Sequence, residues 1–366
     1  MTKKDKYKSA LKVNQGVERP PVVNKRAIKS RPTAKKTLKL DDYVQGIKEG
    51  NRSILAKAIT LIESSLSKHR TLAQEIIQSC LPLSGNSIRI GISGVPGVGK
   101  STFIESFGKS LTEQKHKVAV LAIDPSSSRS KGSILGDKTR MELLSRDKNA
   151  FIRPSPSAGS LGGVAQKTRE TIILCEAAGF DIILVETVGV GQSETTVHSM
   201  VDFFLLLMLS GAGDELQGIK RGIMEMSDAL IINKADGDNI DKAKIAKVQY
   251  ANALHLFPPT PSGWVPQTDT CSAYTGEGID RVWNIIQDYF KLTQENGYFD
   301  ENRKQQEVHR LLENIERRLL NQFYENDTVQ EFIANAKKDI ANNKRSVYSL
   351  VDELFSRHNS ITKEKK

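Results

Sequence analysis

A glycine-rich run that ends in a lysine and a serine is the part of the sequence best suited to chemistry. It matches the phosphate-binding pattern G-x-x-x-x-G-K-[ST], with one further hydroxyl residue behind it. Its residues are Gly94, Val95, Pro96, Gly97, Val98, Gly99, Lys100, Ser101 and Thr102. Backbone N–H groups of such a loop can surround a β-phosphate, Lys100 would reach the β- and γ-phosphates, and the Ser101 hydroxyl would ligate Mg²⁺. The sequence therefore predicts a nucleoside-triphosphate site.

Acidic residues near the ends of apolar runs are the candidate partners of that metal ion. Glu186 ends one such run, where its carboxylate could hold Mg²⁺ directly or through water. Three residues later, the N–H of Gly189 could sense a γ-phosphate, so that the segment 190–196 would change order with the nucleotide. Asp124 and Asp137 are further candidates for holding the metal or orienting the attacking water, although each could instead cap a turn or a helix.

An Asn-Lys-x-Asp motif provides the candidate base-recognition site. The Asp236 carboxylate can accept hydrogen bonds from guanine N1–H and N2–H₂ together, whereas adenine would leave a buried carboxylate unpaired. Lys234 would pack along the base, and the N–H groups of Ser272 and Ala273 would donate to guanine O6. The residues expected on this side of the nucleotide are Asn233, Lys234, Asp236, Ser272, Ala273 and Tyr274. The motif therefore favours GTP over ATP.

Apolar runs alternating with helical stretches predict the elements that position these motifs. The expected strands are Ser87–Ser93, Lys117–Asp124, Ala150–Arg153, Asp181–Glu186, Phe203–Leu209, Ala229–Asn233 and Asp269–Ala273. Continuous apolar runs indicate strands covered on both faces, which is typical of a mostly parallel sheet between helix layers. Ligands of such sheets bind at the carboxyl ends of the strands, where all of the motifs lie. The predicted fold class is an α/β P-loop NTPase.

Helical segments flank the predicted sheet on both sides. Residues Leu40 to Leu83 show apolar spacing of three and four residues, as in amphipathic helices. Beyond Gln294 an apolar stripe runs through a charged helix, and two further helices are expected near Val329–Ile340 and Val347–Phe355. The stripe could pack on its own GTPase domain or on a second subunit. The expected domains are a disordered tail (1–38), a helical segment (39–85), a GTPase domain (86–293) and a helical arm (294–366).

The charge of the chain is concentrated at its N-terminus. Residues 1–36 hold twelve Lys and Arg against Asp5 and Glu18, which accounts for the whole formal net charge of +10. The remainder is neutral, so the basic isoelectric point predicts no nucleic-acid face. The tail is expected to be disordered, the longest apolar run is too short to span a bilayer, and three scattered cysteines suit a reducing compartment. We therefore expect a cytoplasmic protein without membrane contact.

Four longer runs resemble the MeaB/ArgK family of GTPases associated with methylmalonyl-CoA mutase. They are Gly94–Thr102, Ser155–Glu170, Val185–Glu194 and Gly211–Met224, and the resemblance extends from about Leu40 to Tyr289. It implies a Mg²⁺-dependent GTPase that binds GTP and GDP, gates adenosylcobalamin loading, and protects or reactivates an acyl-CoA mutase. It also implies a homodimer joined through C-terminal helical arms.

The resemblance also assigns roles to individual residues. Lys100, Ser101, Asp124, Asp137 and Glu186 match the nucleotide and magnesium site of the family. The segment Ser210–Lys220 matches the mobile element that couples nucleotide state to the mutase. The residues implied in switching and coupling are Gln192, Asp214, Gln217 and Lys220.

Two other functions fit parts of the pattern. A nickel-inserting GTPase would need a stretch rich in His or Cys, whereas the six His and three Cys of this chain are scattered. A P-loop small-molecule kinase, in line with an older family label for arginine and ornithine transport, would prefer ATP and need an acceptor. The Asn233-Lys234-x-Asp236 motif argues against that preference.

Overall fold

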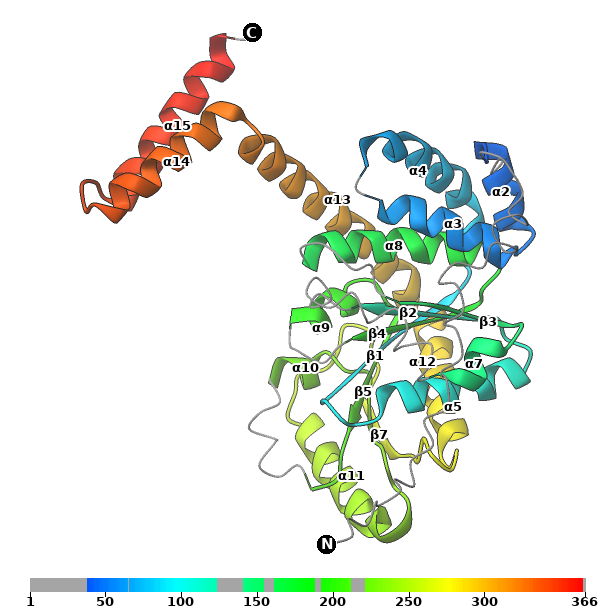
Figure 1. Ribbon diagram of the computed structural model, residues 1–366. Coiled ribbons are helices and arrows are strands. Elements are labelled where there is room, and N and C mark those ends of the chain that lie inside the picture. Colours follow the sequence, from blue (N-terminus) through cyan, green and yellow to red (C-terminus); the bar gives the residue numbers. More distant parts are fainter. Residues whose placement is uncertain are drawn as a thin grey trace, which may run out of the picture. The chain divides into compact units, whose positions relative to one another are not determined.

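A single parallel sheet is the centre of the fold (Figure 1). The computed structural model describes residues 38–64, 66–123, 141–154, 161–187, 192–211 and 221–364. Within these residues the strands are β1 (Ile88–Gly94), β2 (Val118–Ile123), β3 (Ala150–Arg153), β4 (Ile182–Thr187), β5 (Phe203–Met208), β6 (Ala229–Ile232) and β7 (Gln267–Thr270). They pair in the order β3-β2-β4-β1-β5-β6-β7, and every pairing is parallel. The predicted P-loop fold class is confirmed.

Helices cover both faces of the sheet because its strands are apolar on both sides. Leu205 and Leu207 of β5 join the core beneath α5 (Lys100–Glu113) and α12 (Ile279–Glu295). Their neighbours Leu206 and Met208 point to the opposite face, against α11 (Ile240–Leu254). Alternate side chains of one strand therefore enter two separate cores, as expected for a strand buried on both faces. The other helices around the sheet are α7 (Glu142–Arg146), α8 (Leu161–Ala177), α9 (Gln192–His198) and α10 (Arg221–Glu225).

The last strand departs from the prediction. Expected at Asp269–Ala273, β7 instead spans Gln267–Thr270 and pairs with β6 from Ala229↔Gln267 to Ile232↔Thr270. An edge strand can be polar, and Asp269 is held by Lys247 and Arg281 at 2.8 and 2.9 Å. The apolar residues that suggested a strand belong to the loop behind it, where the Ser272 N–H donates to Glu277 O at 2.9 Å.

The N-terminal helical segment consists of α2 (Leu40–Lys48), α3 (Arg52–Glu63) and α4 (Ser67–Cys80), followed by the short 3₁₀ helix η1 (Leu81–Leu83). Asn51 is the N-cap of α3, and its side chain accepts hydrogen bonds from the N–H groups of Ser53 and Ile54. The buried face of α3 includes Leu55, Ile59 and Ile62, and it packs with α4 against α8. The predicted amphipathic spacing thus faces the GTPase domain.

Three helices follow the sheet and the helices that cover it: α13 (Tyr298–Tyr324), α14 (Asp327–Ala341) and α15 (Val347–Glu364). Arg303 attaches the first turns of α13 to the domain. Its guanidinium donates to both Asp202 carboxylate oxygens, at 2.8 and 2.7 Å, and to Ser87 O at 2.6 Å. It also lies 4.3 Å from the centre of the Phe299 ring. Bidentate pairing fixes direction as well as distance, so the root of the arm is held in one orientation.

The three cysteines are all buried. Burial raises the pKa of Cys80 and Cys175, and raises that of Cys271 to about 12. None of the helices in the described part of the chain combines the length and apolarity that crossing a bilayer would demand. The predicted disordered tail, residues 1–38, lies outside the described residues except for its last position.

Candidate nucleotide-binding site

The phosphate-binding loop joins the end of β1 to the start of α5. Gly97 and Gly99 have φ of 79° and 93°, a left-handed backbone that favours glycine. Gly99 is the residue immediately before α5, so the loop turns directly into the helix N-terminus. Backbone N–H groups there have no partner within the helix and can receive phosphate oxygens.

Lys100 and Ser101, the first residues of α5, lie close to the carboxyl end of β4. Ser101 Oγ donates to Glu186 Oε1 at 3.2 Å, and Lys100 Nζ donates to Gly94 O at 2.9 Å. This proximity follows from the sheet, because β1 and β4 are neighbours and Ile92 is in register with Glu186. Burial lowers the pKa of Lys100, while the carboxylates of Glu186 and Glu194 oppose that shift. The structure therefore brings together a half-buried cation, a hydroxyl and a carboxylate beside the loop.

The Asn-Lys-x-Asp motif follows β6. Its Asn233 side chain hydrogen-bonds both the phosphate loop and the loop at Ser272 and Ala273 that follows β7. Asn233 Nδ2 donates to Val98 O at 2.8 Å, while its Oδ1 accepts from the Ala273 N–H at 3.0 Å. Lys234 has a φ of 61°, and its Nζ donates to Gly97 O at 2.8 Å. Asn233 is buried, so its amide is a structural link between three loops rather than a surface group.

Asp236 is oriented by a side-chain hydroxyl. Ser272 Oγ donates to Asp236 Oδ2. The backbone donors that we expected to reach guanine O6 are used elsewhere: the Ser272 N–H donates to Glu277 O, and the Ala273 N–H to Asn233 Oδ1. To donate to guanine O6, each of these N–H groups would share or exchange its present acceptor, and their role in base recognition stays a prediction. Tyr274 is 89% exposed beside them.

Glu194 is a site residue that the sequence analysis did not assign. It lies on α9, is 1% exposed, and accepts from Ser93 Oγ at 3.5 Å and Ser193 Oγ at 3.3 Å. Ser93 in turn accepts from Thr187 Oγ1 at 2.9 Å. A buried carboxylate next to hydroxyls at the ends of β1 and β4 ties α9 to the phosphate loop. Its place shortly after Glu186, in a helix of mostly polar residues, was the only available signal.

Arg169 connects α9 to the C-terminal arm. Located on α8 and 8% exposed, it donates through Nη2 to Ser199 Oγ at 2.7 Å, just after α9. Its Nη1 pairs with Glu313 of α13. Because one planar guanidinium holds both Ser199 and Glu313, a displacement of α9 would also displace α13 or break one of these two contacts.

Several predicted site residues fall outside the described residues. They are Asp124, Asp137, Gly189, Asp214, Gln217 and Lys220. Gln192 is the first residue of α9, but its side chain is not described. Their roles stay predictions.

A family model named for the methylmalonyl-CoA mutase-associated GTPase MeaB matches residues 55–328. The chain belongs to the MeaB family. It is therefore a GTPase, and it binds GTP and GDP. The described geometry is consistent with this, since the phosphate loop, the Ser101–Glu186 pair and the Asp236 loop all meet at one edge of the sheet.

Named relatives and one solved structure support this placement of the MeaB-family chain. It is 45% identical to the GTPase ArgK of Escherichia coli over 84% of this chain and 93% of the relative. It is 44% identical to the mitochondrial methylmalonic aciduria type A homolog of Mus musculus, over 87% and 80%. A crystal structure titled as a LAO/AO transport system kinase matches with a TM-score of 0.71 and 38% identity, covering 87% of this chain and 97% of that one.

Proposed function

We propose that this GTPase is a chaperone of an adenosylcobalamin-dependent acyl-CoA mutase of the methylmalonyl-CoA mutase type. It would gate loading of the cofactor and protect or reactivate the mutase in response to bound nucleotide. The proposal is supported by the family description, which names a mutase-associated GTPase, and by the mouse relative named for methylmalonic aciduria. The observation that carries it is the Arg169 link, which joins the turn after α9 to the helical arm, while the first turn of α9 carries Glu194 beside the phosphate loop.

Hydrolysis would proceed by in-line attack of water on the γ-phosphate. The Lys100 ammonium, exchanging Gly94 O for phosphate oxygens, would stabilise charge that develops on the phosphoryl group. Ser101 Oγ and the Glu186 carboxylate are adjacent oxygen donors, the ligand type that Mg²⁺ prefers, so these residues fit the ion. When bound, Mg²⁺ would neutralise charge on the β- and γ-phosphates. Asp124 and Asp137 remain the proposed candidates for orienting the water.

Base selection would depend on Asp236. The Ser272 hydroxyl occupies one oxygen of its carboxylate and holds the group in position. The carboxylate would then accept from guanine N1–H and N2–H₂, while guanine O6 would share or replace the Asn233 acceptor at the Ala273 N–H. Lys234, which already lies over the loop at Gly97 O, would pack along the base.

We propose that the arm joins two copies of the chain. Beyond the Arg303 anchor, α13 exposes an apolar stripe at spacings of four residues, with Leu311, Ile315 and Leu319 exposed by 59, 46 and 60%. Because each of these side chains is already about half buried, burying the rest contributes roughly 1 kcal/mol each, so a second copy of the stripe would be a favourable partner. The dimer stays a proposal that the oligomeric state tests.

Replacing Leu311 and Leu319 together with Asp should convert a dimer of this 40.6 kDa chain into a monomer. Two charges in the middle of an apolar interface cannot be buried without partners. Analytical ultracentrifugation would measure the mass. The matched control replaces Gln249 and Asn252, exposed residues of α11 away from the arm, with Asp and should stay dimeric. A wild-type monomer, or a dimer that persists in the leucine variant, would remove this interface from consideration.

The chaperone proposal is tested with the purified full chain and a purified adenosylcobalamin-dependent acyl-CoA mutase. Complex formation and cofactor transfer to the mutase are measured with GDP, GTP and a non-hydrolysable GTP analogue. We expect transfer to require GTP turnover and the complex to change affinity at least fivefold between nucleotide states. An Arg169→Lys variant should still hydrolyse GTP without the mutase but lose most of that difference. Equal affinity and transfer in every nucleotide state would refute the proposal.

A further inference from the structure

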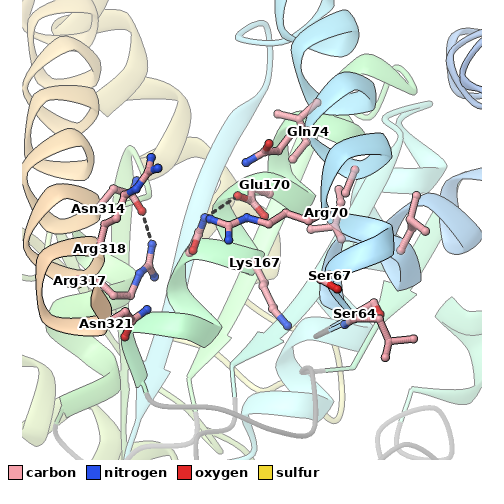
Figure 2. A pocket seen from close by; sticks show the side chains of 16 residues that line it. Ser64, Ser67, Arg70, Gln74, Lys167, Glu170, Asn314, Arg317, Arg318 and Asn321 are labelled. Carbon is pink, nitrogen blue, oxygen red and sulfur yellow. Dashed lines mark hydrogen bonds between the residues drawn. The ribbon is translucent and has the colours of Figure 1, made fainter. Parts of the chain in front are cut away.

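A second pocket lies between α4, α8 and α13, and it shares no lining residue with the nucleotide site. Its volume is about 630 Å³, within the range of small-molecule sites. Figure 2 shows α4 on one side with Arg70 and Gln74, α13 on the other with Arg317 and Arg318, and α8 between them. The pocket is thus formed by the N-terminal helices, α8 and the C-terminal half of α13 together.

The charge of this pocket is strongly positive. Four cationic side chains line it, against a single acidic one, Glu170. The cationic residues are Arg70, Lys167, Arg317 and Arg318. Because the chain after residue 36 has no net charge, a local surplus of three positive charges is not a by-product of overall composition. Like charges held together cost free energy unless an anion joins them.

Three of these cations keep their charge available within the described residues. Lys167 Nζ donates to the backbone carbonyl of Glu63, which is a neutral acceptor. Within the residues that the structure describes, neither Arg70 nor Arg318 forms an ion pair. Both are exposed at the pocket and can turn toward a ligand.

Glu170 is already subtracted in this surplus of three positive charges, and it is oriented by its neighbours on α8. Burial raises its pKa, although Gln166, which donates to its carboxylate at 2.8 Å, and nearby cations oppose the shift. Its hydrogen bond to Gln166 directs it along α8. The acid therefore leaves Arg70 of α4 and Arg318 of α13 available to an external anion.

The wall across from α13 also carries apolar side chains, beside Arg70 and Gln74. Four leucine and isoleucine residues line the pocket on this side. They are Leu61 and Ile62 of α3, Leu66 just before α4, and Ile77 near the end of α4. Leu66 is 52% exposed, which is unusual for a leucine beside a cavity and leaves its surface available to a ligand. A ligand that satisfies both walls needs an anionic group and an apolar part.

We propose that this pocket binds an organic phosphate, with the phosphate held by the arginines of α4 and α13 and the apolar body on the leucine wall. Arginine forms paired N–H bonds that match phosphate oxygens. Serine hydroxyls and asparagine amides that line the pocket can donate hydrogen bonds to the remaining phosphate oxygens. They belong to Ser64, Ser67, Asn314 and Asn321. The site is independent of the mutase proposal and of the phosphate loop.

The test uses phenyl phosphate as the probe and full-length protein saturated with GDP and Mg²⁺, which keeps the phosphate loop filled. Saturation-transfer NMR should show binding of phenyl phosphate with a Kd of about 1 mM or tighter. Phenol, which lacks the anion, should bind at least tenfold more weakly. Inorganic phosphate, which lacks the apolar body, should compete but with lower affinity.

Variants assign the binding to this pocket. Replacing Arg70 and Arg318 together with Ser should weaken phenyl phosphate binding at least tenfold, whereas their replacement with Lys should restore most of it. The matched control replaces Lys68 and Lys304, exposed lysines on the same two helices outside the pocket, with Ser and should change the Kd less than twofold. The proposal fails if wild-type protein does not bind phenyl phosphate, if phenol binds equally well, or if both Ser pairs weaken binding alike.

Discussion

Replacing Lys100 with Ala is expected to reduce GTP hydrolysis by about a thousandfold, the upper range for loss of one preorganised charge-stabilising group. Lys100 Nζ is the half-buried cation of the phosphate loop, and partial burial has already lowered its pKa. Desolvation strengthens the electrostatic interaction of the ammonium group with phosphoryl oxygens. A water molecule in its place would carry no charge and would stabilise these oxygens less. Single-turnover assays with excess protein would measure the chemical step directly.

A matched control is available on the same helix. Lys109 of α5 pairs with Asp147 at 3.0 Å, away from the loop, and its replacement with Ala should leave turnover within about threefold of wild type. Thermal unfolding of both variants would show that the fold is retained. Hydrolysis by the Lys100→Ala protein within tenfold of wild type would overturn the assignment of the phosphate site.

Changing Asp236 to Asn should switch the base preference from guanine to xanthine. An amide presents one donor and one acceptor where the carboxylate presents two acceptors, and xanthine replaces the guanine amino group with a carbonyl. We expect GTP affinity to fall between about 10²- and 10⁴-fold, and affinity for xanthosine triphosphate to rise above it. Competition against a fluorescent GDP analogue would measure both.

The control for this change is Asp238→Asn, which alters an exposed acid two residues further along. It should leave the guanine preference as it is in the wild type. If Asp236→Asn still binds GTP with wild-type affinity, or if the wild type binds ATP as tightly as GTP, then the carboxylate does not select the base.

The sheet could be predicted from sequence because its strands are continuous apolar runs. The run at Phe203 reads as a buried strand in any context, and β3 begins and ends where it was expected, at Ala150 and Arg153. The polar strand β7 could not be placed in this way, because its order depends on pairing with Ala229–Ile232 and on the Asp269 ion pairs. Hydropathy reports burial, and the side chains of β7 are at most partly buried, unlike those of the other edge strand, β3.

Some parts of the site could likewise be predicted from local sequence, whereas others depend on the fold. The phosphate loop and the Asp236 motif are local in sequence, so their residue types could be recognised before any fold was known. The role of Asn233 in holding Val98 O and the Ala273 N–H needs three distant loops to meet, and Glu194 becomes notable only when it is found buried beside Ser93. The pocket between α4 and α13 has no sequence motif, because its cations come from three separate helices.

Burial of all three cysteines makes this protein convenient for spectroscopy. Thiolates react with maleimide and nitroxide reagents, and thiols whose pKa is raised by burial supply few of them at neutral pH. One cysteine introduced at an exposed position of α15, for example at Tyr348, would therefore dominate labelling without removal of the natural ones. Distances between such labels could follow the arm through a cycle of GTP binding and hydrolysis.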